Sequence, residues 1–178
     1  MGTLVVLRIG HRPGRDDRMT THVGLTARAL GADRFVLASG DDSPLTRIDD
    51  VTERFGGPFQ TDHVDAAGAF FVEWDGPIVH LTMYGLPIQE QLPSIRDAAP
   101  PGSDLAIVVG AEKVPFSVYE RADWNVAVTN QPHSEVASLA VMLDRYCDGA
   151  SREHPFTGGT HQIIPHAAGK RVETALDK

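Results

Sequence analysis

The fold class is decided by two stretches, LAIVVGAEKV at residues 105–114 and NVAVTNQPHSEVASLAVMLDR at residues 125–145. Each begins as a short apolar run and breaks into a polar loop, the first at Gly110 and the second at Asn130. The second stretch then resumes with apolar residues at helical spacing. Open α/β sheets bind ligands in the crevice at the carboxyl ends of neighbouring parallel strands. The pattern therefore predicts a small-molecule site at these two loops.

The rest of the chain alternates between strand-like and helix-like segments. Short apolar or β-branched runs predict further strands at residues 3–9, 34–38, 69–74 and 78–83. Helical spacing predicts helices from about residue 22 to 30 and over residues 43–55, 88–99, 115–122 and 133–148. Such alternation is typical of a mainly parallel α/β sheet covered by helices. We expect one domain over residues 1–148 and a weakly structured extension over residues 149–178.

Length and composition point to a globular protein of the cytoplasm. The chain has 178 residues, which is enough for one substantial core. No apolar run approaches the roughly 18 residues that span a bilayer. The opening segment has neither a basic leader nor a cleavage site, so we expect a first strand rather than a signal peptide. Cys147 is the single cysteine, which excludes an internal disulfide.

The charge is acidic overall but unevenly distributed. A net charge of −8 disfavours nonspecific nucleic-acid binding, which depends on neutralising phosphates. The first loop and helix nevertheless hold a cluster of basic residues, namely Arg8, His11, Arg12, Arg15, Arg18, His22 and Arg28. Guanidinium groups bind phosphate in a bidentate manner. Arg12, Arg15 and Arg18 are therefore candidate RNA-binding residues, and a solvated surface loop is the alternative interpretation.

The two deciding loops each have a structural alternative. Gly110 permits a ligand to approach the backbone closely, although an ordinary glycine turn would look the same. Ser134 is placed to cap the following helix after Pro132, which a core helix would also need. Several other sites are excluded by their missing motifs: H-E-x-x-H for a metal hydrolase, G-x-S-x-G, the phosphate loop and G-x-G-x-x-G. We therefore expect no metal.

Four blocks of the chain closely resemble a known family. They are LRIGHRPGRDDRMTTHVGLTARALGAD at residues 7–33, HLTMYG at 80–85, IVVGAEKVP at 107–115 and NQPHSEVASLAVMLDR at 130–145. These blocks resemble the archaeal tRNA 2′-O-methyltransferases that act on cytidine 56 of the T-loop, members of the SPOUT superfamily. The resemblance runs from about Leu4 to Arg145 and is looser beyond residue 149.

The resemblance implies a SPOUT-type α/β fold with a deep C-terminal trefoil knot, whose loops bind S-adenosylmethionine. Carried onto this chain, the residues of those loops are Leu81, Thr82, Met83, Tyr84, Gly85, Val109, Gly110, Ala111, Glu112, Lys113, Val114, Thr129, Asn130, Gln131, Pro132, His133, Ser134, Val136 and Ala137. It also implies a homodimer, with the first helix and the helix after Asn130 near the interface. The C-terminal extension would be associated with that dimer.

The resemblance also suggests catalytic residues. The segment from His22 to Arg28 is similar to an Asn-x-Gly-x-x-x-Arg motif whose arginine positions or activates the ribose hydroxyl. This chain departs from the motif, because it has His22 in place of Asn and Arg28 lies three residues nearer the following Gly-Ala. Arg18 or Arg15 could serve instead. Arginine is effectively never deprotonated, which favours electrostatic stabilisation, with His22 sharing the proton transfer.

We therefore expect S-adenosylmethionine-dependent 2′-O-methylation of a tRNA ribose, at cytidine 56 of the T-loop. The alternative is a catalytically inactive RNA-binding protein that keeps the knotted fold.

Overall fold

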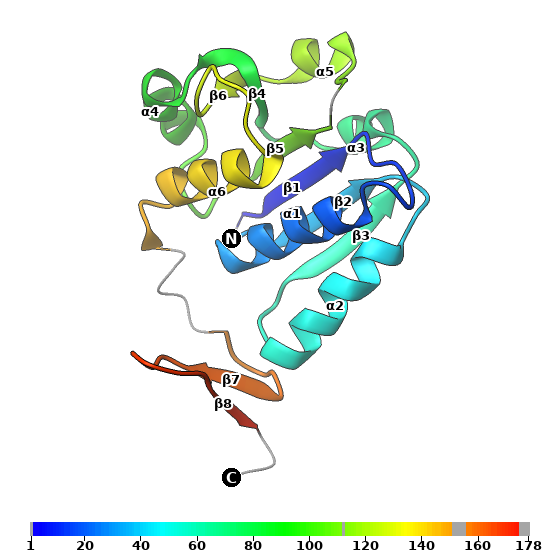
Figure 1. Cartoon of the computed structure of the whole chain (residues 1–178). Helices are drawn as coiled ribbons and strands as arrows, with labels where there is room; N and C mark the ends of the chain where they lie inside the picture. The colour runs from blue at the N-terminus through cyan, green and yellow to red at the C-terminus, as the bar shows by residue number, and fades with distance from the viewer. Residues whose placement is uncertain (1, 112, 151–155, 175–178) are drawn as a thin grey trace.

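The computed structural model describes residues 2–111, 113–150 and 156–174. Within them, six strands form one sheet in the order β3-β2-β1-β5-β4-β6, and every neighbouring pair is parallel (Figure 1). The strands are β1 Leu4–Ile9, β2 Arg34–Ala38, β3 Gln60–Val64, β4 Ile78–Pro87, β5 Leu105–Gly110 and β6 Trp124–Ala127. The predicted α/β class with a parallel sheet is confirmed.

Helices cover both faces of the sheet. They are α1 Asp17–Ala29, α2 Ser43–Phe55, α3 Ala67–Glu73, α4 Ile88–Ala98, α5 Phe116–Arg121 and α6 Glu135–Tyr146. Side chains alternate along each strand, so neighbours enter opposite cores. Val6 packs in the core that includes Leu139 of α6. Val5 packs in the core that includes Phe70 of α3 and Val118 of α5. None of the described helices is long and apolar enough to cross a membrane.

Three elements differ from the sequence predictions. The predicted strand at residues 69–74 is helix α3, because Phe70 and Trp74 stack at helical spacing with their ring centroids 5.5 Å apart. Strand β3, with the sequence QTDHV, has no predicted counterpart, since it lies at the sheet edge with mostly exposed residues. Helix α1 begins at Asp17 rather than near His22, because its first turn is polar.

The C-terminal extension contains an antiparallel hairpin, so the expectation of weak structure is wrong for its described part. Strand β7 His161–Ile164 pairs with β8 Arg171–Thr174. The hairpin lies beside the end of α2, at the bottom of Figure 1. The amide of Gly57 donates to the carbonyl of Thr157 at 2.8 Å, and the rings of Phe55 and His161 lie 5.8 Å apart.

Candidate active site

A half-open cavity of about 300 Å³ lies at the carboxyl ends of β4 and β5. The described residues that line it are His80, Leu81, Thr82, Met83, Tyr84, Val109, Gly110, Ala111, Val114, Tyr119, His133, Glu135 and Ser138. The sequence predicted a small-molecule crevice at this edge, which is the usual ligand edge of an open α/β sheet. It placed the strands that end at Gly110 and Asn130 side by side, and the structure corrects this, because β4 lies between β5 and β6.

An outward loop of β4 forms one wall of the cavity. The pairing of β4 with β6 jumps from Leu81 to Leu86, both opposite Val126, so residues 82–85 leave the ladder. The side-chain amide of Asn130 donates to the carbonyls of Met83, at 2.8 Å, and Gly85, at 3.0 Å. The loop after β6 is thereby tied to the loop of β4. Residue 85 must be glycine, because a Cβ there would lie 2.4 Å from a backbone oxygen.

The structure brings about half of the predicted cofactor residues to the cavity. Those in its lining are Leu81, Thr82, Met83, Tyr84, Val109, Gly110, Ala111, Val114 and His133. Those placed outside the lining are Gly85, Lys113, Thr129, Asn130, Gln131, Pro132, Ser134, Val136 and Ala137. Glu112 lies outside the described residues. Asn130 therefore shapes the cavity by holding its wall, whereas Val136 lines a separate groove beside α1.

Three lining residues lie outside the predicted loops, namely His80, Tyr119 and Ser138, and Glu135 lies within the predicted loop at residues 129–137 but was not named as a cofactor residue. His80 stands in the middle of a buried strand, and a histidine inside an apolar run was the one available signal. Its Nδ1 lies 2.8 Å from Oδ1 of Asn125 on β6. Burial lowers the pKa of this imidazole, and the hydrogen bond to Asn125 opposes that shift. Tyr119 completes the wall, with its hydroxyl 3.2 Å from Oγ1 of Thr82.

Glu135 places a carboxylate in the cavity wall and is held from beneath by a buried arginine. Arg8 on β1 is buried, and its Nη2 lies 3.2 Å from Oε1 of Glu135. The Nε and Nη1 atoms of Arg8 are buried and have no hydrogen-bond partner among the described residues. The ion pair therefore fixes the first turn of α6 against the sheet.

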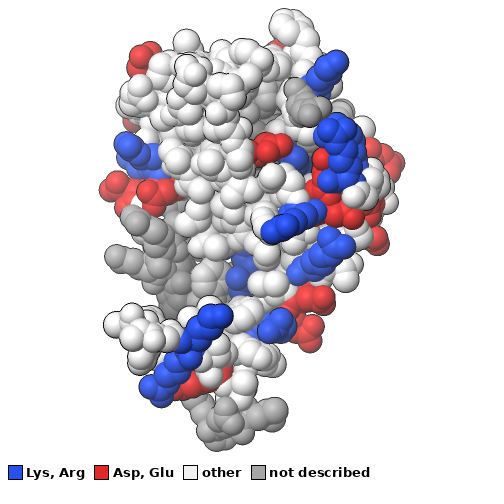
Figure 2. All heavy atoms as spheres, in the orientation of Figure 1, with Lys and Arg blue, Asp and Glu red and all other residues white. Residues whose placement is uncertain are grey.

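The predicted RNA-binding arginines lie at the same edge of the sheet, on the loop after β1 and the first turn of α1. The guanidinium of Arg12 donates two hydrogen bonds to the carboxylate of Asp16, from Nε to Oδ2 at 2.9 Å and from Nη2 to Oδ1 at 3.2 Å. This hydrogen bonding holds the pKa of the Asp16 carboxyl below its usual range. Arg15 and Arg18 have exposed side chains on this surface. Figure 2 shows basic and acidic side chains interleaved on the face that it draws.

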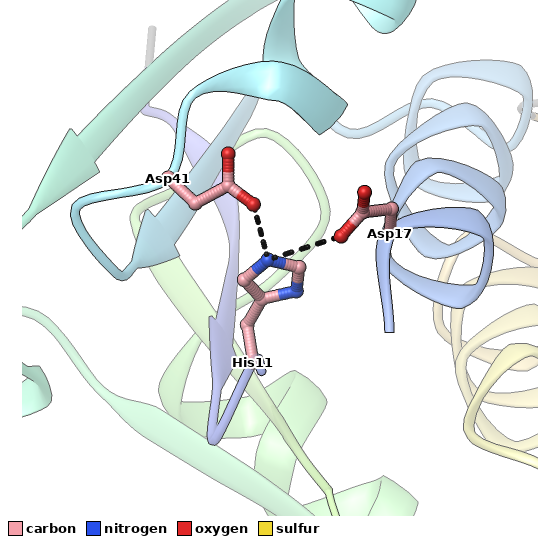
Figure 3. A group of neighbouring side chains, drawn as sticks. All are labelled: His11, Asp17 and Asp41. Atoms are coloured by element: carbon pink, nitrogen blue, oxygen red, sulfur yellow. Dashed lines mark hydrogen bonds and ion pairs between the residues drawn. The ribbon is translucent and has the colours of Figure 1, made fainter. Parts of the chain in front are cut away.

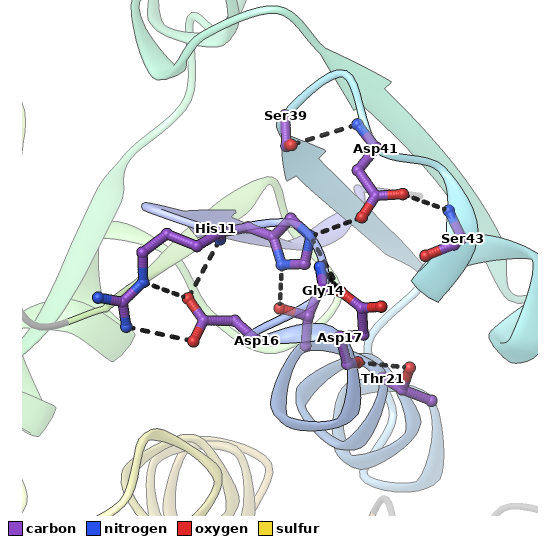
Figure 4. A network of polar contacts seen from close by, with 10 residues as sticks. His11, Gly14, Asp16, Asp17, Thr21, Ser39, Asp41 and Ser43 are labelled. Carbon is purple, nitrogen blue, oxygen red and sulfur yellow. Dashed lines mark hydrogen bonds and ion pairs between the residues drawn. The ribbon is translucent and has the colours of Figure 1, made fainter.

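A buried histidine braces the arginine-bearing loop (Figures 3 and 4). Nδ1 of His11 lies 2.8 Å from Oγ1 of Thr20, and Nε2 lies 3.1 Å from Oδ2 of Asp41 and 3.8 Å from Oδ1 of Asp17. The hydrogen bond from His11 is the largest cause of the lowered pKa of Asp41. Ligand atoms of His11, Asp17 and Asp41 lie within 4.8 Å of one another. Both ring nitrogens already have partners, so hydrogen bonding accounts for this cluster.

The structure does not bring Arg28 or His22 to the cavity. Nη2 of Arg28 donates to the carbonyl of Gly56, and its guanidinium lies 4.6 Å from the ring centre of Phe156. Arg28 is in the last turn of α1 and therefore faces the amino-terminal edge of the sheet. His22 lines a groove between α1 and α6. The motif-based assignment of catalysis to Arg28 is thus not supported by its position.

Solved structures share this fold. An RNA 2′-O ribose methyltransferase superposes with a TM-score of 0.59 at 21% identity, covering 84% of this chain and 57% of that one. The SpoU methyltransferase AviRb from Streptomyces viridochromogenes, in complex with AdoMet, gives a TM-score of 0.56 at 14% identity, covering 85% of this chain and 57% of that one. The sheet and the cavity at its carboxyl edge therefore define a protein with the fold of the SpoU-type RNA methyltransferases.

Sequence comparison gives the family. Residues 55–173 match the model of the tRNA ribose 2′-O-methyltransferases, aTrm56, and the chain belongs to this family. The tRNA (cytidine(56)-2′-O)-methyltransferase of Natronomonas pharaonis is 56% identical over 96% of this chain and 94% of its own length. That of Thermococcus kodakarensis is 52% identical over 95% of this chain and 96% of its own length. The resemblance found in the sequence blocks is confirmed.

Proposed function

We propose that this protein transfers a methyl group from S-adenosylmethionine to the ribose 2′-hydroxyl of cytidine 56 in tRNA. One observation carries the proposal: a relative named for this activity is 56% identical over 96% of this chain. The cavity at the carboxyl ends of β4 and β5 gives the reaction a site on the fold. Since tRNA is the substrate, we assign the enzyme to the cytoplasm.

The cofactor site that we propose is this cavity. A volume of about 300 Å³ is at the lower end of the roughly 300–1,000 Å³ that small-molecule sites occupy. S-adenosylmethionine, when bound, supplies an electrophilic methyl group on a positively charged sulfur. Its single carboxylate is outweighed by the sulfonium and ammonium charges, so Glu135 offers a complementary charge. Asn130 and Arg8 would hold the loop and the carboxylate in place beforehand, which lowers the ordering cost of binding.

For the RNA, we propose that Arg12, Arg15 and Arg18 bind phosphates of the tRNA. They share the carboxyl edge of the sheet with the cavity, and guanidinium groups suit phosphate geometry. Arg18 is our candidate for orienting the attacking hydroxyl, with Arg15 as the alternative. An arginine stays protonated, so its contribution is electrostatic stabilisation of the developing negative charge.

We further propose that the enzyme is a homodimer joined through α1 and α6. The support is an apolar groove of about 360 Å³ between these helices, lined by His22, Leu25, Thr26, Ala29, Leu30 and Val136. Figure 2 draws mostly uncharged atoms over α4 and α6. On the hairpin, Ile163 and Val172 are exposed and directly paired, so the extension offers a second apolar contact. His22 would then lie at the interface, where it remains a candidate for proton transfer.

The dimer has its own test. Light scattering should give a mass of twice 19.3 kDa. The variant Ala29→Glu, which places a charge in the groove, should shift the protein to monomers. A wild-type protein that stays monomeric at all concentrations would overturn this part of the proposal.

The C-terminal trefoil knot is also a proposal. It is supported by the two hydrogen bonds from Asn130 to the loop at residues 82–85, which hold the chain after β6 against carbonyls that precede Asn130 by 47 and 45 residues in sequence. Such a close crossing of two loops is what a threaded chain requires.

The catalytic proposal is tested by separating binding from transfer. Calorimetry should show saturable binding of S-adenosylmethionine, and incubation with a tRNA transcript should give labelled tRNA. An inactive RNA-binding protein would bind tRNA with a steep salt dependence, yet would neither bind the cofactor nor transfer methyl. That second outcome would overturn the proposal.

A further inference from the structure

The hydrogen-bond network around His80 determines which of its ring nitrogens carries a proton. The side-chain amide nitrogen of Asn125 donates to the carbonyl of Tyr119 at 2.9 Å. The other side-chain atom of Asn125, its Oδ1, therefore faces Nδ1 of His80 at 2.8 Å. An amide oxygen can only accept, so Nδ1 of His80 must be the donor. In the neutral ring this leaves Nε2 without a proton.

The Nε2 atom of His80 is a buried acceptor without a donor. His80 has no exposed surface, and Nε2 has no hydrogen-bond partner among the described residues. Burial lowers the pKa of the ring, which keeps it neutral. A buried acceptor that lacks a donor is costly, and such atoms are commonly satisfied by a ligand or water. The nearby hydroxyls of Tyr119 and Thr82 are already within bonding distance of each other.

The cavity has two chemically different ends. His80 lies with Val114 and Tyr119 at the end that belongs to the core beneath α3 and α5, and its ring meets Tyr119 edge-on at 4.7 Å. Glu135 and Ser138 come from α6, which packs on the opposite face of the sheet. One end is therefore aromatic and uncharged, and the other is acidic. This division matches a ligand with a neutral nucleoside and a charged amino-acid portion.

We propose that Nε2 of His80 accepts a hydrogen bond from the nucleoside half of the bound cofactor, either from the adenine amino group or from a ribose hydroxyl. His80 would thus be a cofactor-binding residue outside the loops at residues 81–85, 109–114 and 129–137. The inference rests on the proposed function, because it takes S-adenosylmethionine as the occupant of the cavity.

The first test compares cofactor analogues with the wild-type protein and with His80→Phe, which keeps a ring in the strand but removes the acceptor. The probes are S-adenosylhomocysteine and its 6-deamino, 2′-deoxy and 3′-deoxy forms, measured by calorimetry. We expect His80→Phe to lower the affinity for S-adenosylhomocysteine about fivefold to tenfold. The analogue that lacks the group donating to Nε2 should bind the wild-type protein and His80→Phe equally. That analogue therefore identifies the donor group of the cofactor. If all four compounds lose affinity by the same factor, or none does, the proposal is wrong.

The second test needs no substitution and so does not depend on a variant that folds. Nitrogen NMR of protein labelled in histidine reports the protonation of each ring nitrogen. We expect an unprotonated Nε2 and a protonated Nδ1 for His80, and a shift of the Nε2 resonance on saturation with S-adenosylhomocysteine. A protonated Nε2, or a resonance unchanged at saturation, would overturn the inference. Absence of any cofactor binding would instead contradict the proposed function.

Discussion

Arg8 Nη2 lies 3.2 Å from Oε1 of Glu135, and this contact joins the centre of the sheet to the first turn of α6 across 127 positions of sequence. The side chain of Arg8 is 1% exposed and that of Glu135 is 28% exposed. The guanidinium therefore depends on one carboxylate for its charge balance, and that carboxylate is also part of the cavity wall. We therefore expect stability and cofactor binding to be coupled at this pair.

Glu135→Gln should lower both the free energy of unfolding and the affinity for S-adenosylmethionine. Removing one partner of a buried ion pair leaves an uncompensated charge, which costs about 3 kcal/mol. Urea unfolding checks the stability, and calorimetry checks the affinity for S-adenosylmethionine. Glu90→Gln is the matched control, since Glu90 is an exposed glutamate in the first turn of α4. It should change stability by no more than about 0.5 kcal/mol. Equal effects of the two substitutions would contradict the role of the pair.

Asp41→Asn should destabilise the protein in a pH-dependent way. The hydrogen bond from His11 holds the pKa of Asp41 below the usual value of 3.8 for this carboxyl, so the carboxylate contributes stability above that pH and loses it as the pH falls through the folded-state pKa. The deficit of the variant in urea unfolding should therefore be largest near neutral pH and shrink below about pH 4. Asp42→Asn, an exposed neighbour, is the control and should show little deficit. A deficit independent of pH would argue against the ionic character of this contact.

Substituting Arg28 should lower stability and leave methyl transfer, whereas substituting Arg18 should leave stability and slow methyl transfer. Arg28→Ala removes a buried hydrogen bond to Gly56 and the packing on Phe156, so it should cost about 1–3 kcal/mol while the folded variant still transfers methyl groups. Arg18→Ala should leave stability almost unchanged and slow transfer by about 100-fold, with unaltered cofactor affinity. Thermal unfolding and single-turnover assays separate the two. Loss of transfer in a stable, cofactor-binding Arg28→Ala protein would restore the motif-based assignment.

Metal removal should have no effect on this enzyme. The cluster of His11, Asp17 and Asp41 has the ligand types for a divalent ion, but both nitrogens of His11 are within hydrogen-bond distance of protein partners. EDTA should change neither the melting temperature nor the rate of methyl transfer, and added Zn²⁺ or Mn²⁺ should not raise the melting temperature. A fall in melting temperature on chelation would identify the cluster as a metal site.

The sequence predicts those parts of the molecule whose signal is local. Leu4–Ile9 and Leu105–Gly110 are strands buried on both faces, and their apolar runs, interrupted in the first strand only by Arg8, identify them. QTDHV of β3 has no such run because an edge strand keeps most of its side chains in solvent. Residues 69–74 are as apolar as a strand, and composition alone cannot distinguish them from the short helix α3.

In the site, too, features with a local signal were predicted, and features that depend on tertiary contacts were not. The loops after β5 and β6 were predicted because the chain breaks at the ends of two apolar runs, whereas residues 81–85 of β4 were predicted only from the family resemblance. The tautomer of His80 depends on Asn125, which is 45 positions away and becomes its neighbour only through strand pairing. The position of Arg28 depends on which edge of the sheet the last turn of α1 reaches, and motif spacing does not report this.

The central claim is tested most directly by methyl transfer to tRNA transcripts that differ at one ribose. Labelled S-adenosylmethionine is incubated with the protein and with transcripts that carry 2′-deoxycytidine at position 56, a 2′-deoxy sugar at the adjacent position, or neither. We predict label on the unmodified and adjacent-deoxy transcripts and none on the transcript that lacks the 2′-hydroxyl at position 56. Label on that transcript, or on none of the three, would contradict the account.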